Sequence, residues 1–321
     1  MDFELSPDEV GLKEGIRKLC DGRFPMERVR ELESLGGVHR TLWQELAETG
    51  VFCLRLAEAD GGLGFGMAQS VLVFEELGRA LVPGPLVGTD LAAQLLPRVA
   101  TGEEVVGVVE RNSDPLVVDY LDAVDRLLVL DDAGVWSVPP DEVEDRGPVP
   151  RPIDPLTPLH VIRTMPQGEQ VGDAEAAARL RLDGVVLTAA LLVGSAQAVT
   201  DLAVAYAKER QQFGRPIGGF QAVKHILADM QMRASVAQAA LYAAGVTLDD
   251  PEVGDPVRAA SAAKVTAGEA AVLNGKGAIQ VHGGMGFTWE VDAHLHLKRA
   301  WFLDTTFGST DHHAELLAHL L

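Results

Sequence analysis

The first part of the chain carries a helical pattern of hydrophobic and polar positions. Apolar side chains recur three or four residues apart, as at Val71, Phe74 and Leu77, and this spacing puts them on one face of a helix. Ser6 is followed by a proline and two acidic residues, which is typical of a helix start with an N-cap residue. We therefore expect an N-terminal helical domain over residues 1–100.

The pattern then changes to short apolar runs. Three β-branched or apolar runs are separated by Asp, Gly and Pro, as strands usually are. They are residues 105–109, 127–130 and 135–138. Prolines are concentrated from Pro139 to Pro166, where they disfavour long helices and central strands. The pattern predicts a small β domain over residues 101–183.

Helical spacing returns near Gly184 and continues to the end of the chain. Leu187, Leu191 and Leu202 share one face of a predicted long helix that ends at Arg210. Further helices are predicted over residues 220–248, 256–284 and 292–320, and their many Ala and Gly residues permit close packing. The fold class is therefore mostly α with a small β domain, and residues 184–321 are expected to form a C-terminal four-helix bundle.

Composition narrows the classes of function. The chain has 321 residues and a net charge of −20, so nucleic acids and anionic membranes would be repelled. Its two cysteines, Cys20 and Cys53, are typical of a reduced protein without a disulfide framework. No basic leader or uncharged apolar run of about 20 residues is present. We expect a cytoplasmic protein that binds neither nucleic acid nor membrane.

The most informative stretch, Lys208 to Gln221, joins the first two helices of the predicted bundle. Arg210 precedes an aromatic-glycine turn that contains Phe213, and Gln221 starts the next helix. A guanidinium pairs bidentately with phosphate oxygens, so this arrangement suits a diphosphate and its attached groups. Arg215 and Lys224 extend a basic island in a very acidic chain.

A second element follows the third predicted helix and contains Gln280, Gly283 and Gly284. Glycine allows a backbone to approach a ligand closely. Taken singly, these residues have ordinary explanations: Arg210 as a surface ion-pair residue, Phe213 as core and the glycine pair as a helix C-cap. The two elements together favour a cofactor-binding role.

The order of the domains, with these two elements, resembles the acyl-CoA dehydrogenase family, specifically so from about Leu187 onward. The resemblance implies oxidation of an acyl-CoA thioester: a carboxylate removes the α-proton and hydride passes to N5 of FAD. It also implies that FAD lies across a subunit interface and that an electron-transfer flavoprotein accepts the electrons. The residues matching those that hold a neighbouring subunit's FAD are Arg210, Phe213, Gln221, Gln280, Gly283 and Gly284.

The sequence departs from the family at the catalytic base. Phe307 stands where most members carry a glutamate, and Gly184 stands at the alternative base position on the long helix. Asp183 is the one carboxylate nearby, and it is expected either to cap that helix or to act as an atypical base. The run Val108–Pro115 also lacks the Gly-Ala-Gly turn of the family's flavin loop. We expect this subunit to lack the ring-binding half of a flavin site.

Histidines near the C-terminus do not have the spacing of a metal site. His294 and His296 are two residues apart on a predicted helix, and His312 and His313 are adjacent. Helical metal pairs need a spacing of three or four residues. No metal is expected, and these side chains are interpreted as surface or interface residues.

These features indicate the non-base-bearing subunit of a heterotetrameric (α2β2) acyl-CoA dehydrogenase, of the kind that the family uses for steroid and other bulky acyl-CoA substrates. The FAD would be shared with a catalytic partner subunit. Two alternatives stay open. One is a self-sufficient homo-oligomeric dehydrogenase that uses Asp183 or another base. The other is a non-catalytic acyl-CoA-binding or scaffold protein.

Overall fold

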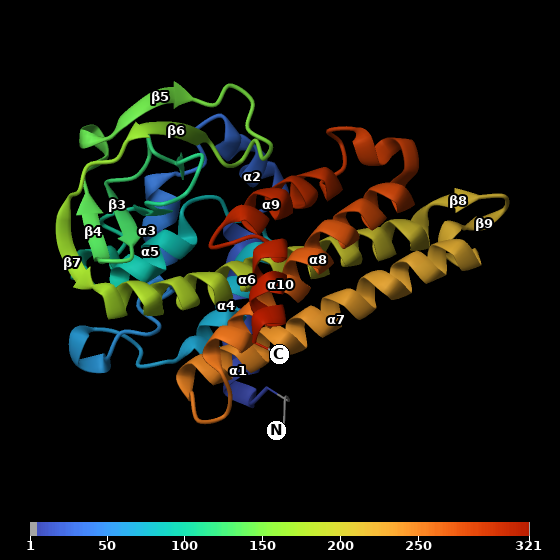
Figure 1. Cartoon of the computed structure of the whole chain (residues 1–321). Coiled ribbons are helices and arrows are strands. Elements are labelled where there is room, and N and C mark those ends of the chain that lie inside the picture. Colours follow the sequence, from blue (N-terminus) through green and yellow to red (C-terminus); the bar gives the residue numbers. More distant parts are fainter. Residues whose placement is uncertain (1–4, 321) are drawn as a thin grey trace.

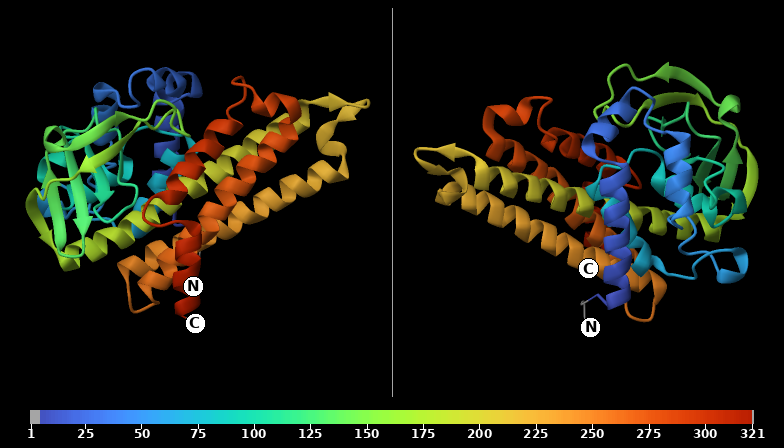
Figure 2. Two further views of the ribbon diagram at one scale, coloured as in Figure 1. Left: turned by 45° about the horizontal axis from the view of Figure 1, so that its top comes forward. Right: turned by 180° about the vertical axis from the view of Figure 1, so that it is seen from behind.

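The structure is a computed structural model that describes residues 5–320. Figure 1 shows the β strands of the middle region gathered at one side with N-terminal helices beside them, and long C-terminal helices extending away from them. The two views in Figure 2 show the same arrangement, with the hairpin of β8 (Gln211–Gln212) and β9 (Arg215–Pro216) projecting at the far end. The predicted fold class is confirmed.

The N-terminal region is helical, as its hydrophobic spacing predicts. Its helices are α1 (Pro7–Arg23), α2 (Met26–Glu33), α3 (Arg40–Glu48), α4 (Met67–Arg79) and α5 (Leu86–Ala93). The predicted N-cap at Ser6 is confirmed: its side chain accepts a hydrogen bond from the Glu9 backbone, and Glu9 bonds back to the Ser6 backbone. This reciprocal capping box satisfies N–H groups that the first turn of a helix leaves free.

The middle region forms two small sheets. Their strands are β1 (Val106–Glu110), β2 (Val117–Asp119), β3 (Arg126–Asp131), β4 (Gly134–Val138), β5 (Glu144–Pro148), β6 (Leu159–Thr164) and β7 (Glu169–Asp173). One sheet has the order β1-β3-β4-β7 and the other β2-β6-β5. The expectation that the proline-rich segment lacks a central strand is wrong, because β6 has no proline of its own and pairs on both edges.

The long helix α6 (Ala174–Glu209) begins earlier than Gly184. Its N-cap is Asp173, whose carboxylate accepts a 2.9 Å hydrogen bond from the Ala176 backbone. The prediction that Asp183 caps this helix is therefore wrong. Although α6 is long and apolar enough to cross a membrane, 83% of its apolar window is buried inside the protein. It is the central helix of the fold.

The other C-terminal helices are α7 (Gln221–Asp249), α8 (Pro256–His282), α9 (Ala293–Thr305) and α10 (Thr310–His319). The predicted helix over residues 292–320 is therefore two helices. The break follows Thr306, because Phe307 and Gly308 both adopt left-handed backbone angles (φ 54° and 91°) that no α-helix contains.

Helices α4 and α6 cross at glycines that bring the two backbones together. A Cβ on Gly194 would lie 1.8 Å from the carbonyl oxygen of Glu75, and one on Gly78 would lie 2.1 Å from that of Leu191. Larger side chains at these positions would separate the helices. The glycines thus set the distance between the N-terminal region and the bundle.

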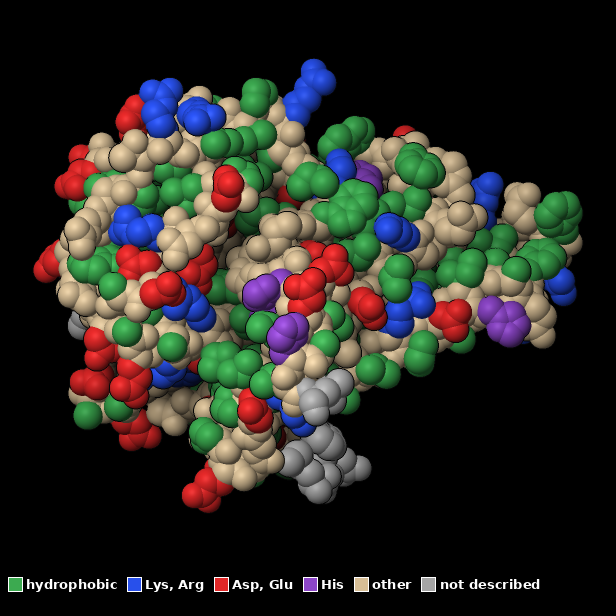
Figure 3. Space-filling view, in the orientation of Figure 1, with side chains coloured by type: hydrophobic (Ala, Val, Ile, Leu, Met, Phe, Trp, Pro, Cys, Tyr) green, Lys and Arg blue, Asp and Glu red, His purple; other side chains and the backbone are tan. Residues whose placement is uncertain are grey.

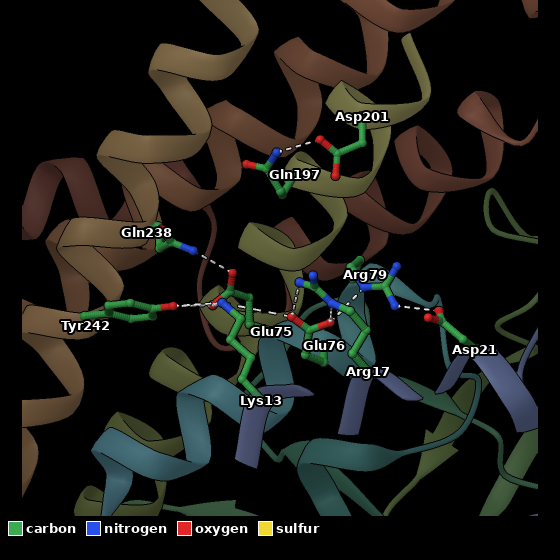
Figure 4. Close-up of polar contacts among 10 residues, drawn as sticks. All are labelled: Lys13, Arg17, Asp21, Glu75, Glu76, Arg79, Gln197, Asp201, Gln238 and Tyr242. Carbon is green, nitrogen blue, oxygen red and sulfur yellow. Dashed lines mark hydrogen bonds and ion pairs between the residues drawn. The ribbon is translucent and has the colours of Figure 1, made fainter. Parts of the chain in front are cut away.

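A buried polar network joins α1, α4 and α7 beside this crossing (Figure 4). Glu75 accepts hydrogen bonds from Gln238 and Tyr242 at 2.7 and 2.8 Å and lies 2.7 Å from the ammonium of Lys13. Glu76 pairs with Arg17 and with Arg79, each at 2.7 Å. Pairing of this kind offsets the cost of burying the two carboxylates.

Candidate functional site

The first predicted cofactor element forms the outer end of the bundle. Arg210 is the C-cap of α6, and its carbonyl accepts a 2.8 Å hydrogen bond from the backbone of Ile217. Between them lies the short hairpin β8 (Gln211–Gln212) and β9 (Arg215–Pro216). Phe213 stands at the hairpin turn with 91% of its surface exposed. Gln221 is the first residue of α7 and is also exposed.

The second element lies at the same end of the bundle. Gln280 belongs to the last turn of α8, and Gly283 and Gly284 begin the 3₁₀ turn Gly283–Phe287. A stack of Tyr206 on His282, with ring centroids 4.2 Å apart, joins this end of α8 to α6. The fold therefore brings together two elements that are far apart in the sequence.

The chemistry of this outer end suits a ligand with phosphates and aromatic rings. A Cβ on Gly283 or Gly284 would meet no atom within 4 Å, so their backbone is open to an approaching group. The exposed cations Lys208, Arg210, Arg215 and Lys224 surround the hairpin. Figure 3 shows hydrophobic and basic side chains together at this end. These residues fit a diphosphate-bearing cofactor such as FAD.

The two positions where the family resemblance predicts a base, Phe307 and Gly184, lie in direct contact with each other. The ring of Phe307 covers Gly184 so closely that a Cβ there would lie 2.4 Å from the ring's Cζ atom. The ring is partly buried and packs against the main hydrophobic core. The contact accounts for a glycine inside a long helix, since no larger residue fits beneath the ring. Neither position offers a proton acceptor.

Asp183 is buried within α6, where it is 7% exposed. It forms a 2.5 Å ion pair with Arg55, which makes a second 2.5 Å pair with Asp90. Burial alone would lower the pKa of Arg55, but the two carboxylates outweigh it and raise that pKa. Asp183 is therefore paired with an arginine that stays positively charged. Sequence reasoning missed Arg55 because a lone arginine in a loop carries no pattern.

A cavity of about 490 Å³ adjoins this ion pair. It lies where the N-terminal region, α6 and the turn between α7 and α8 meet, and its wall includes Arg55, Phe65, Leu182, Asp183 and Leu248. A volume of this size is within the range of small-molecule sites. Its wall combines apolar surface with a few polar groups.

The run Val108–Pro115 comprises the end of β1 and the connection to β2. Arg111 ties this connection down: its guanidinium donates hydrogen bonds of 3.0–3.1 Å to the carbonyls of Met165, Pro166 and Gln167. It also pairs with Asp131 at 3.0 Å. An arginine side chain thus fixes this connection.

The interpretation of the C-terminal histidines as surface or interface residues is wrong for three of the four, because these are buried within the chain itself. His294, His296 and His313 are buried, and His296 bonds through Nδ1 to the Ser195 hydroxyl at 2.9 Å. Burial lowers the pKa of His294 to about 4 and that of His296 to about 3. Within residues 5–320, no group of three or more His, Cys, Asp or Glu could hold a metal ion.

Comparison with known proteins places the whole chain in one family. Residues 6–104 match the acyl-CoA dehydrogenase N-terminal domain, and residues 183–321 match the C-terminal domain. The acyl-CoA dehydrogenase IpdE2 of Mycolicibacterium smegmatis is 33% identical over 92% of this chain and 93% of its own length.

Two solved structures have the same fold. The Tcur3481-Tcur3483 steroid ACAD matches with a TM-score of 0.84 at 24% identity, covering 98% of this chain and 97% of that one. The ChsE4-ChsE5 complex from Mycobacterium tuberculosis matches with a TM-score of 0.83 at 22% identity, covering 99% and 98%. With the two matched domains and a relative aligned over almost its full length, the chain belongs to the acyl-CoA dehydrogenase family of FAD-dependent oxidoreductases.

Proposed function

We propose that this chain is the base-lacking subunit of a heteromeric acyl-CoA dehydrogenase and that it completes the FAD site of a catalytic partner. The observation that carries the proposal is the contact between Phe307 and Gly184. Proton abstraction from the α-carbon needs a carboxylate within hydrogen-bond reach. The phenyl ring at position 307 supports the absence of such a carboxylate in this chain, and the open backbone and exposed cations at the outer end of the bundle support a cofactor-binding role.

The residues of the outer end have separate roles in this proposal. Arg210 pairs with the diphosphate, Gly283 and Gly284 let their backbone approach it, and Phe213 packs on the cofactor's apolar surface. Gln221 and Gln280 donate hydrogen bonds to its polar edge. FAD, when bound, accepts the hydride; the partner subunit supplies the base and the pocket for the flavin ring.

The assembly is proposed to be an α2β2 heterotetramer that oxidises a bulky, steroid-like acyl-CoA. The names of two structural relatives support this: one is a steroid ACAD and the other is a complex of two different chains. An electron-transfer flavoprotein is the proposed electron acceptor, and the cytoplasm is the proposed location. The proposal for the partner rests on the missing base, since the reaction cannot proceed without one.

Co-expression tests the proposal directly. The chain should purify colourless when expressed alone, and with a base-bearing acyl-CoA dehydrogenase as partner it should form a complex with a flavin absorption spectrum. Activity on acyl-CoA should require both chains. A yellow, active protein made from this chain alone would overturn the proposal.

Substitutions at the outer end test the assigned roles. In the co-expressed complex, Arg210→Ala and Phe213→Ala should each lower the flavin bound per complex without dissociating the subunits. Arg28→Ala is the matched control, because Arg28 is an exposed arginine on α2, outside both cofactor elements. Equal flavin content in all three variants would remove these residues from the cofactor site.

The homo-oligomeric alternative, with Asp183 as the base, is favoured by the cavity beside that residue. Asp183→Asn distinguishes the two, because activity should collapse only if Asp183 takes the proton. Its ion pair with Arg55 opposes a base role, since proton uptake would break a buried pair. If no candidate partner brings flavin, a non-catalytic binding or scaffold role is favoured instead.

A further inference from the structure

The turn that carries Phe307 is held from two sides by buried side chains outside the site described above. On one side, Lys264 of α8 is fully buried, and its ammonium donates to the carbonyls of Leu303 and Thr306 at 2.9 and 2.6 Å. These carbonyls belong to the end of α9 and the start of the turn. The Leu303 carbonyl also accepts a hydrogen bond from the Thr306 backbone at 3.2 Å. The lysine adds a donor to it and gives the Thr306 carbonyl, which lies just past the helix end, a buried partner.

On the other side, His313 of α10 holds the next carbonyl. Its Nε2 lies 2.8 Å from the Phe307 oxygen, and its Nδ1 lies 3.0 Å from the Ser261 hydroxyl. A carbonyl can only accept, so Nε2 carries the proton and Nδ1 accepts from Ser261. Ser261 and Lys264 are one turn apart on α8, and α10 lies across that helix. Both supports therefore depend on α8.

The backbone of the turn needs this support. Phe307 has φ 54°, a left-handed conformation that is unfavourable for a bulky residue and persists only where its surroundings impose it. Asp304 adds a further brace by accepting hydrogen bonds from the backbone and hydroxyl of Thr310 at 3.2 and 2.5 Å. Gly268 leaves room for it, because a Cβ there would lie 2.2 Å from the Thr310 hydroxyl.

We propose that Lys264 and His313 are positioning residues that clamp the turn between α9 and α10, and so fix the side chain at position 307 over Gly184. Donors from α8 and α10 hold the successive carbonyls of Thr306 and Phe307. With the backbone held at these two points, the direction of the side chain at position 307 is set. In this protein the projected group is a phenyl ring that closes the space above α6. The role of the ring in closing this space rests on the proposed function, whereas the clamp formed by Lys264 and His313 does not.

A fluorine label at position 307 tests the clamp without flavin or partner. 4-Fluorophenylalanine placed there alone should give one ¹⁹F resonance, shifted from the free amino acid and protected from a soluble gadolinium chelate. Lys264→Met removes both N–H donors but keeps the apolar stem. In this variant the resonance should move toward the free amino acid value and lose its protection. Lys276→Met, an exposed lysine on the same helix, should leave it unchanged.

If Lys264→Met is too unstable to purify, His313→Phe carries the test, because it keeps a ring but removes the donor to Phe307. An unchanged resonance and unchanged protection would overturn the clamp, even if the melting temperature fell, since that result indicates a purely structural role. Failure of co-expression to yield flavin would count against the proposed function and leave this measurement unaffected.

Discussion

At the scale of single residues, Phe307 and Gly184, the two positions where the family resemblance places a base, form one contact. Phe307 and Gly184 are far apart in the sequence, yet the ring of one fills the space that any side chain of the other would occupy. A carboxylate at position 184 would therefore clash with the ring. Introducing a carboxylate at this contact requires a change at position 307, or changes at both positions.

Gly184→Ala tests this contact. The added methyl group should lower the free energy of unfolding by about 1–3 kcal/mol, the usual cost of overpacking, despite the higher helix propensity of alanine. In the double variant that combines Gly184→Ala with Phe307→Ala, most of that loss of stability should disappear, because the ring is no longer there to clash. The measurement is urea denaturation. Gly22→Ala is the control: it is exposed in α1 with open space at its Cβ, so it should stabilise the protein slightly.

Lys264 should make stability depend on alkaline pH. Burial lowers its pKa from 10.5 to about 7, with Asp304 opposing the shift. Between pH values of about 7 and 10.5, Lys264 is protonated in the unfolded chain and mostly deprotonated in the folded one. The unfolded chain therefore binds more protons, and stability rises with pH in this window. The difference in unfolding free energy between wild type and Lys264→Met should therefore shift in favour of wild type as pH rises above 7. A constant difference would contradict this.

At the scale of elements, the start of α6 is the main departure from the hydrophobic pattern. An Asp-Gly pair is a common helix boundary, and it occurs at Asp183 and Gly184. In the structure the helix continues through both, because Arg55 pairs with the first and the Phe307 ring covers the second. The boundary lies at Asp173, which makes the capping hydrogen bond.

The N-cap at Asp173 can be tested by substitution. Asp173→Ala should lower stability by about 0.5–2 kcal/mol, because the first turn of α6 loses the acceptor for its free N–H groups. Glu14→Ala, an exposed acid inside α1, should change stability by less than about 0.5 kcal/mol. Denaturation midpoints measure both. A cost for Asp173→Ala no larger than that of the control would place the helix start elsewhere.

At the scale of the whole molecule, buried ionisable groups connect its parts. The network of Glu75 and Glu76 ties α1 and α4 to α7 (Figure 4). Two histidines of α9, His294 and His296, are also buried. Burial alone would raise the pKa of Glu76, but hydrogen bonds from Arg17 and Arg79 outweigh it and lower that pKa. The protein therefore depends on a charged glutamate and on neutral histidines.

Stability should consequently fall in acid. The unfolded histidines take up protons below their ordinary pKa of 6.5, whereas folded His294 and His296 resist protonation until about pH 4 and 3. The loss should begin below pH 6.5, and Glu76 should add to it as pH falls through its lowered pKa. Denaturation midpoints between about pH 7.5 and 5 measure the slope, and His296→Gln should flatten it. An unchanged slope in His296→Gln would show that His296 does not contribute to the loss of stability in acid.

The order of helical and β regions and the capping at Ser6 can be predicted from the sequence alone, which also indicates the two elements proposed to bind a cofactor. These features depend on local spacing and short motifs, which a chain carries wherever it folds. The assignment of those elements to FAD remains a prediction.

Tertiary contacts determine the start of α6, the ion pair of Asp183 with Arg55 and the burial of three of the four C-terminal histidines. They also place Phe307 on Gly184 and set Lys264 beneath the same turn. Each of these features joins residues from different elements, often far apart along the chain. Packing and electrostatic pairing between them outweigh local preference, and no local pattern records such contacts.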